Sequence, residues 1–182
     1  MVKPRYERGA WARRGRKAPG TSVQFADRVE LPVSVETVWA RLRDVEAAAT
    51  CLPGLVAGSL RPVGGGAFEA TMRQTTLGVT ASWALRAEFV ASDADRRLDV
   101  RLNGRDARLG MTMTGDATVI VADDGGRAAL DCRTDVRVEG RLAATGGPII
   151  RGVVEETLRS FVGSLAGREP EARRGLKGRL RR

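Results

Sequence analysis

The stretch that decides the fold is GPIIRGVVEETLRSFVGSLAG, residues 147–167. Its apolar residues recur in adjacent pairs every four positions, and charged or small residues fill the gaps, as an amphipathic helix requires. Pro148 suits a first helical position, where its missing N–H needs no partner, and Gly167 followed by Pro170 supplies a stop. Because a period of four drifts against 3.6 residues per turn, the apolar surface sweeps around the helix. Such a helix requires a broad concave partner.

The segments upstream of this helix supply that partner as strands. Ser22–Leu31 is predicted as the first strand, and from Leu55 onward a period of two predicts about six antiparallel strands. Leu55–Leu60 is expected to be the first of these, with residues 62–66 as the turn after it, and Gly115 is expected to mark a bulge or bend. Since the strands alternate apolar and polar residues, the sheet has one dry face that must be covered.

Two short helices are predicted between the first strand and the others. Ser34 is a good N-cap, and the four residues after it that recur with helical spacing are Val35, Val38, Trp39 and Leu42. Asp44 is expected to cap a second helix over Val45–Leu52. The predicted fold is therefore α+β: a curved antiparallel sheet of about seven strands wrapped around a long C-terminal helix, with two short helices after the first strand.

The charge of the chain divides it into three parts. Of the net charge of +9 over 182 residues, residues 1–20 carry +6 and residues 168–182 carry +5, which leaves −2 on the body. We predict a basic, disordered N-terminal arm over residues 1–21, one folded domain over residues 22–167 and a basic C-terminal tail over residues 168–182.

Several functional classes are excluded or disfavoured by composition. The chain has no histidine, so imidazole acid–base catalysis and histidine metal ligation are excluded. Cys51 and Cys132 lack metal or redox spacing, and Cys51 is interpreted as a small buried residue at a helix end. No apolar run approaches the ~20 residues needed to cross a bilayer, and the N-terminus lacks the apolar core of a signal peptide, so a cytoplasmic protein is expected.

The candidate ligand-binding residues are the apolar side chains expected to face the long helix or to project from it. Three of them are methionines, whose flexible and polarizable side chains suit a deformable apolar pocket. The same residues can also simply fill the core, and the sequence leaves both interpretations open. The set comprises Phe68, Met72, Trp83, Leu85, Met111, Met113, Val119, Val154, Leu158 and Phe161.

The arrangement of charged residues argues against catalysis. The charged residues of the strands fall on the face opposite the apolar set, and the expected inward exceptions are Gln74, Thr134 and Cys132, which are weak acids and bases. Asp106, with Arg105 and Arg108 near a strand end, is assigned to a solvated loop in preference to the mouth of a cavity. We therefore predict a protein that is not an enzyme, has no catalytic residues and holds no metal or covalent cofactor.

The C-terminal tail has the composition of a polybasic membrane tether. Each basic charge near an anionic surface contributes about 1 kcal/mol, although its two leucines alone would not anchor the chain. A solubilising tail and a nucleic-acid-binding arm are the alternatives, and the second is disfavoured because the tail has no aromatic residue to stack on a base. The predicted contact residues are Arg173, Arg174, Lys177, Arg179, Arg181 and Arg182.

Three local matches give the chain a family resemblance. Val35–Trp39 resembles a helix start common in the START-like (SRPBCC, helix-grip) superfamily. Cys51-Leu52-Pro53-Gly54 is similar to a turn of the CoxG family of carbon monoxide dehydrogenase proteins, and residues 140–143 leading into 146–161 are similar to that family's approach to its last helix. The resemblance covers about residues 22–165. Leu77-Gly78-Val79 departs from it, because a glycine–proline turn is expected there.

The resemblance implies a helix-grip fold and a role as an accessory protein of a molybdenum hydroxylase of the aerobic carbon monoxide dehydrogenase type. Such a protein binds a quinone-like molecule or another lipid between sheet and helix, contacts the molybdenum hydroxylase subunits and links the enzyme to the inner face of the cell membrane. Other START-like relatives resemble polyketide aromatase/cyclases, which gives the alternative function.

Overall fold

The computed structural model describes residues 20–140, 143 and 146–165. Seven strands and three helices follow one another in the order that the sequence predicts. In chain order they are β1 (Gly20–Leu31), α1 (Val35–Arg43), α2 (Val45–Ala49), β2 (Arg61–Gly64), β3 (Ala67–Thr76), β4 (Val79–Ser92), β5 (Arg97–Asp106), β6 (Met111–Asp124), β7 (Arg127–Glu139) and α4 (Gly147–Leu165).

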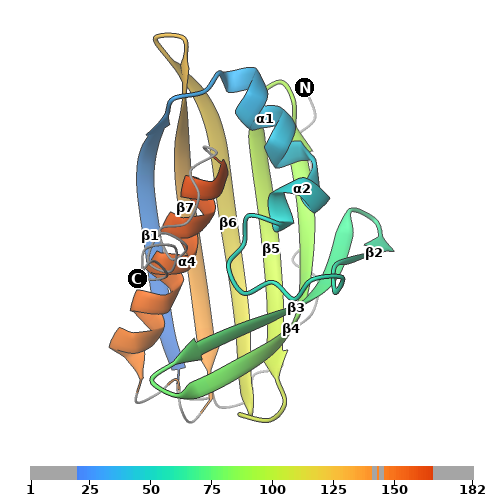
Figure 1. Cartoon of the computed structure of the whole chain (residues 1–182), viewed down its shortest axis with the longest axis vertical. Coiled ribbons are helices and arrows are strands. Elements are labelled where there is room, and N and C mark those ends of the chain that lie inside the picture. The colour runs from blue at the N-terminus through green and yellow to red at the C-terminus, as the bar shows by residue number, and fades with distance from the viewer. Residues whose placement is uncertain (1–19, 141–142, 144–145, 166–182) are drawn as a thin grey trace, which may run out of the picture.

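All seven strands form one antiparallel sheet in the order β1-β7-β6-β5-β4-β3-β2. The sheet curves so strongly that the β3–β4 hairpin crosses in front of β5 and β6 at the lower end of the molecule (Figure 1). Helix α4 lies on the concave side of the sheet, in front of β1 and β7, and α1 lies across its upper end (Figure 1). The predicted curved sheet wrapped around a C-terminal helix is confirmed.

The caps of the two short helices are those that the sequence predicts. The side chain of Ser34 accepts a hydrogen bond from the N–H of Thr37, and the carboxylate of Asp44 accepts one from the N–H of Ala47. Each cap satisfies an N–H group that has no partner inside its helix. The second helix ends at Ala49, three residues earlier than predicted, because the chain continues into a turn before Pro53.

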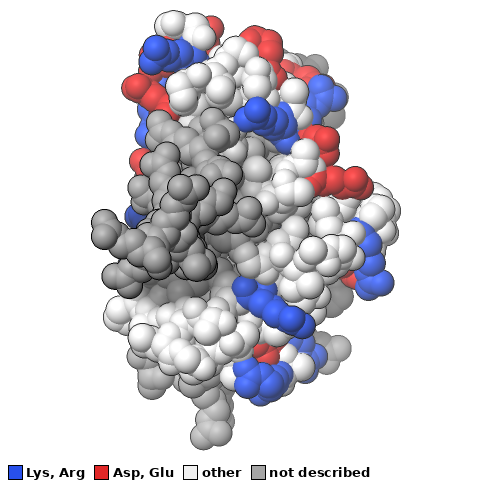
Figure 2. Space-filling model, viewed as in Figure 1, with Lys and Arg blue, Asp and Glu red and all other residues white. Residues whose placement is uncertain are grey.

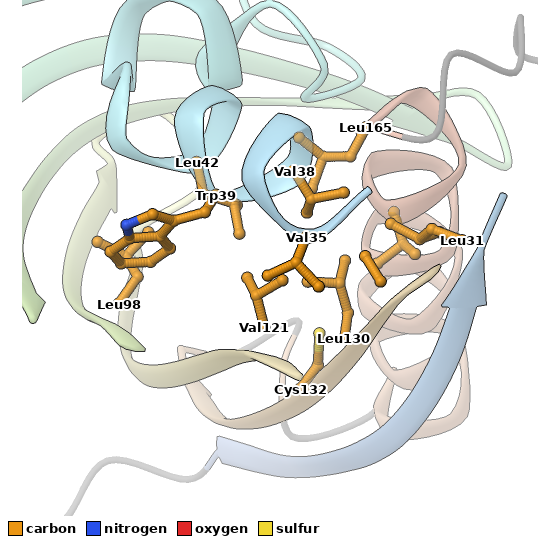
Figure 3. Packing of buried hydrophobic residues seen from close by; sticks show 12 residues of the cluster. Leu31, Val35, Val38, Trp39, Leu42, Leu98, Val121, Leu130, Cys132 and Leu165 are labelled. Carbon is orange, nitrogen blue, oxygen red and sulfur yellow. The ribbon is translucent and has the colours of Figure 1, made fainter. Parts of the chain in front are cut away.

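The core is divided into two clusters of buried side chains. The first joins α1 to the C-terminal end of α4, and its 0% to 8% exposed members are Leu31, Val35, Val38, Trp39, Leu42, Leu98, Val121, Ala128, Leu130, Cys132, Val162 and Leu165 (Figure 3). Arg41 strengthens this junction by donating a hydrogen bond of 2.6 Å to the carbonyl of Leu165. The second cluster lies towards the N-terminal end of α4, and consists of Met72, Trp83, Met111, Met113, Val136, Val138 and Ala143.

Two predictions about the strands are wrong. Leu55–Leu60 is not a strand: it contributes only an isolated bridge from Leu55 to Met72, and Gly58 has a positive φ of 72°. The chain pairs instead at Arg61–Gly64, where Pro62 is tolerated because β2 is an edge strand. Gly115 is also not a bulge, since β6 keeps an unbroken register with β5 and β7 through it.

The ends of the predicted domain lie partly outside the described residues. Gly167, residues 1–19 of the predicted basic arm and all six predicted contact residues of the C-terminal tail fall among residues 1–19 and 166–182. Gly20 and Thr21, predicted to belong to the disordered arm, instead begin β1. The three described helices include none that is both long and apolar enough to cross a membrane.

Candidate functional site

The predicted ligand-binding residues do face each other across sheet and helix. Met72 pairs with Trp83, Gly104 with Met113, and Asp106 with Met111, so the strand members share the concave face. They separate into two groups by burial. The buried members of the set belong to the second core cluster and are Met72, Trp83, Met111 and Met113; the half-buried members are Phe68, Leu85, Val119, Val154, Leu158 and Phe161.

An apolar surface that neither core cluster covers lies between the two clusters. We call it the central surface; its members outside both clusters are half-buried and include Phe68, Ala70, Ala87, Ala117 and Leu158. Phe68 meets Phe89 edge to face, with 5.8 Å between ring centroids. Although α4 spans 19 residues, only Val162 and Leu165 are buried. The helix is therefore packed tightly against the sheet at its C-terminal end, and its middle is only partly buried.

Small residues on β4 and β6 leave room on the concave face of the sheet. Ala87 pairs with Leu102, which pairs with Gly115, and Val100 pairs with Ala117. At Gly115 an added Cβ would lie 3.4 Å from the side chain of Val136. The absence of a side chain at Gly115 therefore leaves space on the concave face. Sequence reasoning missed these positions because it selected large apolar residues. The available signal was that alanine and glycine fall in register on the same face as Phe68.

Few polar side chains reach the concave face, and one of them attaches α4 to the β3–β4 hairpin. Gln74 donates a hydrogen bond of 2.8 Å to the hydroxyl of Thr157, which donates to the carbonyl of Val153. Thr134 is half-buried on the central surface, opposite Ala117 and Phe25. The prediction that Gln74 and Thr134 face inward is confirmed. A ligand held here would meet mainly carbon, with Thr134 as a polar partner.

Cys132 also faces inward, as predicted, within the first core cluster. Burial, together with the negative charges of Asp27 and Asp131, raises the pKa of this thiol to about 11. A thiol that stays protonated near neutral pH is a poor nucleophile and a poor metal ligand. Cys51 packs half-buried beside the same cluster, and neither cysteine forms a disulfide. The described residues contain no group of three or more acidic or cysteine side chains that could hold a metal ion.

Asp106 contradicts its assignment to a solvated loop, because it is only 1% exposed. Its carboxylate accepts hydrogen bonds from the N–H of Ser82 at 2.7 Å and of Leu109 at 2.9 Å. Burial alone raises the pKa of Asp106, but these backbone hydrogen bonds and the positive charge of Arg108 outweigh it and lower that pKa. The carboxylate therefore fixes the β5–β6 turn against β4 and is not available as a catalytic acid. The sequence missed this because buried turn carboxylates and exposed ones share the same turn signals.

Two hollows in the surface lie outside the central surface. One of about 430 Å³ lies between the start of β1 and the first turns of α4, lined by Thr21, Gly147, Pro148, Arg151, Gly152 and Glu155. A larger one of about 630 Å³ lies on the convex face, where Arg61, Arg86 and Arg105 surround Ala84. Because charged side chains border the larger hollow, it suits an apolar ligand less well than the central surface does, in spite of its size.

Comparison with known proteins agrees with this architecture. The model of a family described as polyketide cyclase/dehydrase and lipid transport matches residues 22–179. No curated protein matches the chain by sequence.

Solved structures share the fold at low sequence identity. A conserved protein from Geobacillus kaustophilus superposes with a TM-score of 0.71 at 18% identity, covering 80% of this chain and 93% of that one. The Zhui aromatase/cyclase from Streptomyces sp. R1128 gives 0.58 at 18%, covering 80% and 92%. Norcoclaurine synthase from Thalictrum flavum, in complex with dopamine and hydroxybenzaldehyde, gives 0.56 at 14%, covering 82% and 87%. These likenesses concern the fold.

Proposed function

Because the chain belongs to the polyketide cyclase/dehydrase and lipid transport family, we propose that it is a binding protein that holds an apolar small molecule between α4 and the sheet. The observation that carries this proposal is the central surface. Its half-buried apolar residues lie between two well-packed clusters, beneath a helix that is fully buried only at Val162 and Leu165. A domain that needed α4 only for stability would bury this middle section as it buries the end.

We further propose that this protein has the role of a CoxG protein of carbon monoxide dehydrogenase. In that role it is an accessory to a molybdenum hydroxylase, carries a quinone-like molecule or another lipid, and meets the inner face of the cell membrane through its basic ends. The support is the Cys51–Gly54 motif, which forms a tight turn with Gly54 at a φ of 84°. At Gly54 an added Cβ would lie 2.3 Å from the carbonyl oxygen of Arg73, so only glycine fits.

The non-enzymatic part of the proposal is supported by the chemistry of the concave face. Among the described strand residues, the carboxylates in inward register are Asp27, Asp106 and Asp123. Asp123 accepts a hydrogen bond from the N–H of Gly126 in the β6–β7 turn. Asp106 is bound to backbone N–H groups, and Asp27 is exposed on the edge strand β1. An aromatase/cyclase function would require an acid or base at the central surface. If Asp27→Asn abolished turnover of an aromatic polyketide, the enzymatic alternative would replace ours.

Ligand binding is tested by extracting the purified full chain with organic solvent and by native mass spectrometry. We expect a lipid or quinone to co-purify and to be lost in Ala117→Leu, which fills the central surface. Ala84→Leu is the matched control, because Ala84 is exposed on the convex face and should leave the ligand in place. If both variants and the wild type carry no apolar molecule and none binds on addition, the proposal fails.

The proposed role beside a molybdenum hydroxylase is tested separately. Co-purification of hydroxylase subunits with the tagged chain from its native cells would support it, and their absence under conditions that retain the apolar ligand would overturn this part alone. Nucleic acid is not among the proposed partners. Retention on DNA that falls steeply with salt would contradict that expectation.

A further inference from the structure

The turn that joins β3 to β4 exposes an apolar side chain in an unfavourable backbone conformation. Leu77 and Gly78 have φ values of 49° and 78°, and Thr76 pairs with Val79 across them, as in a two-residue hairpin turn of type I′. Asparagine, aspartate or glycine is preferred where φ is positive, because a leucine there is strained. Leu77 is nevertheless 82% exposed, so it makes little packing contact that would offset this strain.

Leu77 is part of a wider apolar tip. Val79 beside it is 49% exposed, and among the large apolar residues that the structure describes, Val90 at the other end of β4 is comparably exposed, at 53%. The tip lies at the lower end of the molecule, where the β5–β6 turn and the first turn of α4 also lie (Figure 1). Gln74, three residues before Leu77, is bonded to Thr157 of α4, so the hairpin that carries the tip also contacts the helix over the central surface.

The surroundings of the tip are basic although the folded body as a whole is not. Residues 70–87 contain no acidic residue, and residues 104–115 contain only Asp106, whose carboxylate is buried and bound to backbone N–H groups. Glu139, opposite Thr112 on β7, forms an ion pair with Arg137. Arg73, Arg105 and Arg108 are exposed there, and Arg108 donates a hydrogen bond to the carbonyl of Thr80, next to the tip. In Figure 2 the position of this hairpin shows mostly uncharged atoms, with a group of basic side chains on one side.

We propose that the β3–β4 tip docks on an anionic lipid surface, with Leu77 and Val79 entering the boundary of the acyl chains and the three arginines meeting phosphate groups. Apolar residues flanked by cations are the combination that interfacial membrane contacts use. Burial in lipid would also offset the strain at Leu77, which packing in the free protein does not. The proposal rests on the membrane part of the proposed function and deepens it, but it requires neither a bound ligand nor the basic tail.

The test is co-sedimentation of the full chain with vesicles of phosphatidylglycerol and phosphatidylcholine, compared with vesicles of phosphatidylcholine alone. We expect binding to the anionic vesicles to weaken roughly ten- to a hundredfold in Leu77→Asn, from the lost burial of one leucine. Asparagine suits a positive φ, so the melting temperature should be unchanged or raised, which separates lost docking from lost folding. Arg105→Gln and Arg108→Gln should each weaken binding about fivefold.

Matched controls lie at the opposite end of the molecule. Val90→Asn removes an apolar side chain that is 53% exposed, against 82% for Leu77, and Arg127→Gln removes an exposed arginine; neither should change vesicle binding. The effect of Leu77→Asn should persist in a chain ending at residue 167. If the full chain binds the vesicles and the chain ending at residue 167 does not, the tail is the tether, and docking by the tip is overturned. Equal binding by wild type and Leu77→Asn, or equal loss in Val90→Asn, would overturn it too.

Discussion

The C-terminal end and the middle of α4 cover the same sheet in different ways. At the C-terminal end, Leu165 is 1% exposed and packs with the first core cluster, which includes Leu42 and Leu130 at 1% and 0% (Figure 3). In the middle, Leu158 is half-buried and belongs to neither core cluster. Both sections carry apolar residues, but the middle also carries Arg151, Glu155 and Glu156, whereas residues 161–165 contain no charged residue. Stability and the proposed binding function are thus separated along one helix.

The largest expected effect compares one leucine from each section. Leu130→Ala should lower the free energy of unfolding by about 2–5 kcal/mol, because it leaves a cavity in a packed cluster. Leu158→Ala should cost less than about 1.5 kcal/mol, since its side chain is already partly exposed. Urea denaturation of both variants measures the difference. Equal costs would show that the middle of α4 is packed as tightly as its end.

The next largest effect concerns Asp106, whose carboxylate accepts hydrogen bonds from backbone N–H groups at the β5–β6 turn. Asp106→Asn should lower the free energy of unfolding by about 1–3 kcal/mol, because one N–H loses its acceptor. The folded pKa of Asp106 is lowered, so its contribution is present above the unfolded pKa and is lost as pH falls through the folded value. Urea denaturation of wild type at descending pH should show this loss, and Asp106→Asn should lack that part of it. An identical acid profile in both proteins would contradict the assignment.

Cys132 should have a smaller effect on the free energy of unfolding, and only at alkaline pH. Its folded pKa is raised to about 11 from an ordinary value of 9.0, so the thiol stabilises the fold below the unfolded pKa, and that contribution is lost as pH rises from about 9 to about 11. By pH 10 the loss should be about 1.4 kcal/mol, equivalent to one pKa unit. Cys132→Ala should lack this decline in urea denaturation, after allowance for its lower stability at neutral pH.

A thiol-labelling reagent at neutral pH should modify half-buried Cys51 faster than Cys132.

These residues also show how far the sequence determines the fold and the site. Periodicity predicted the order of strands and helices along the chain, the caps at Ser34 and Asp44, and the inward face that carries Phe68, because each depends on local spacing or on a single hydrogen bond. It misplaced β2, since Pro62 favours a turn locally and only pairing with β3 makes it an edge strand. It could not divide the apolar set into core and central surface. That division depends on which small residues lie opposite α4 after the sheet curves.

The smallest expected effect concerns the hydrogen bond from Gln74 to Thr157, which attaches the middle of α4 to the β3–β4 hairpin. Gln74→Leu removes this bond between half-buried groups, so global stability should change by no more than about 1 kcal/mol. If α4 is held firmly only at its C-terminal end, amide hydrogen exchange should nevertheless accelerate over residues 150–158 and stay unchanged over residues 161–165. Arg41→Gln, which removes the bond to the carbonyl of Leu165, should show the reverse pattern. Uniform acceleration along the helix in both variants would mean that α4 opens as one unit, and that the central surface is covered as firmly as the core.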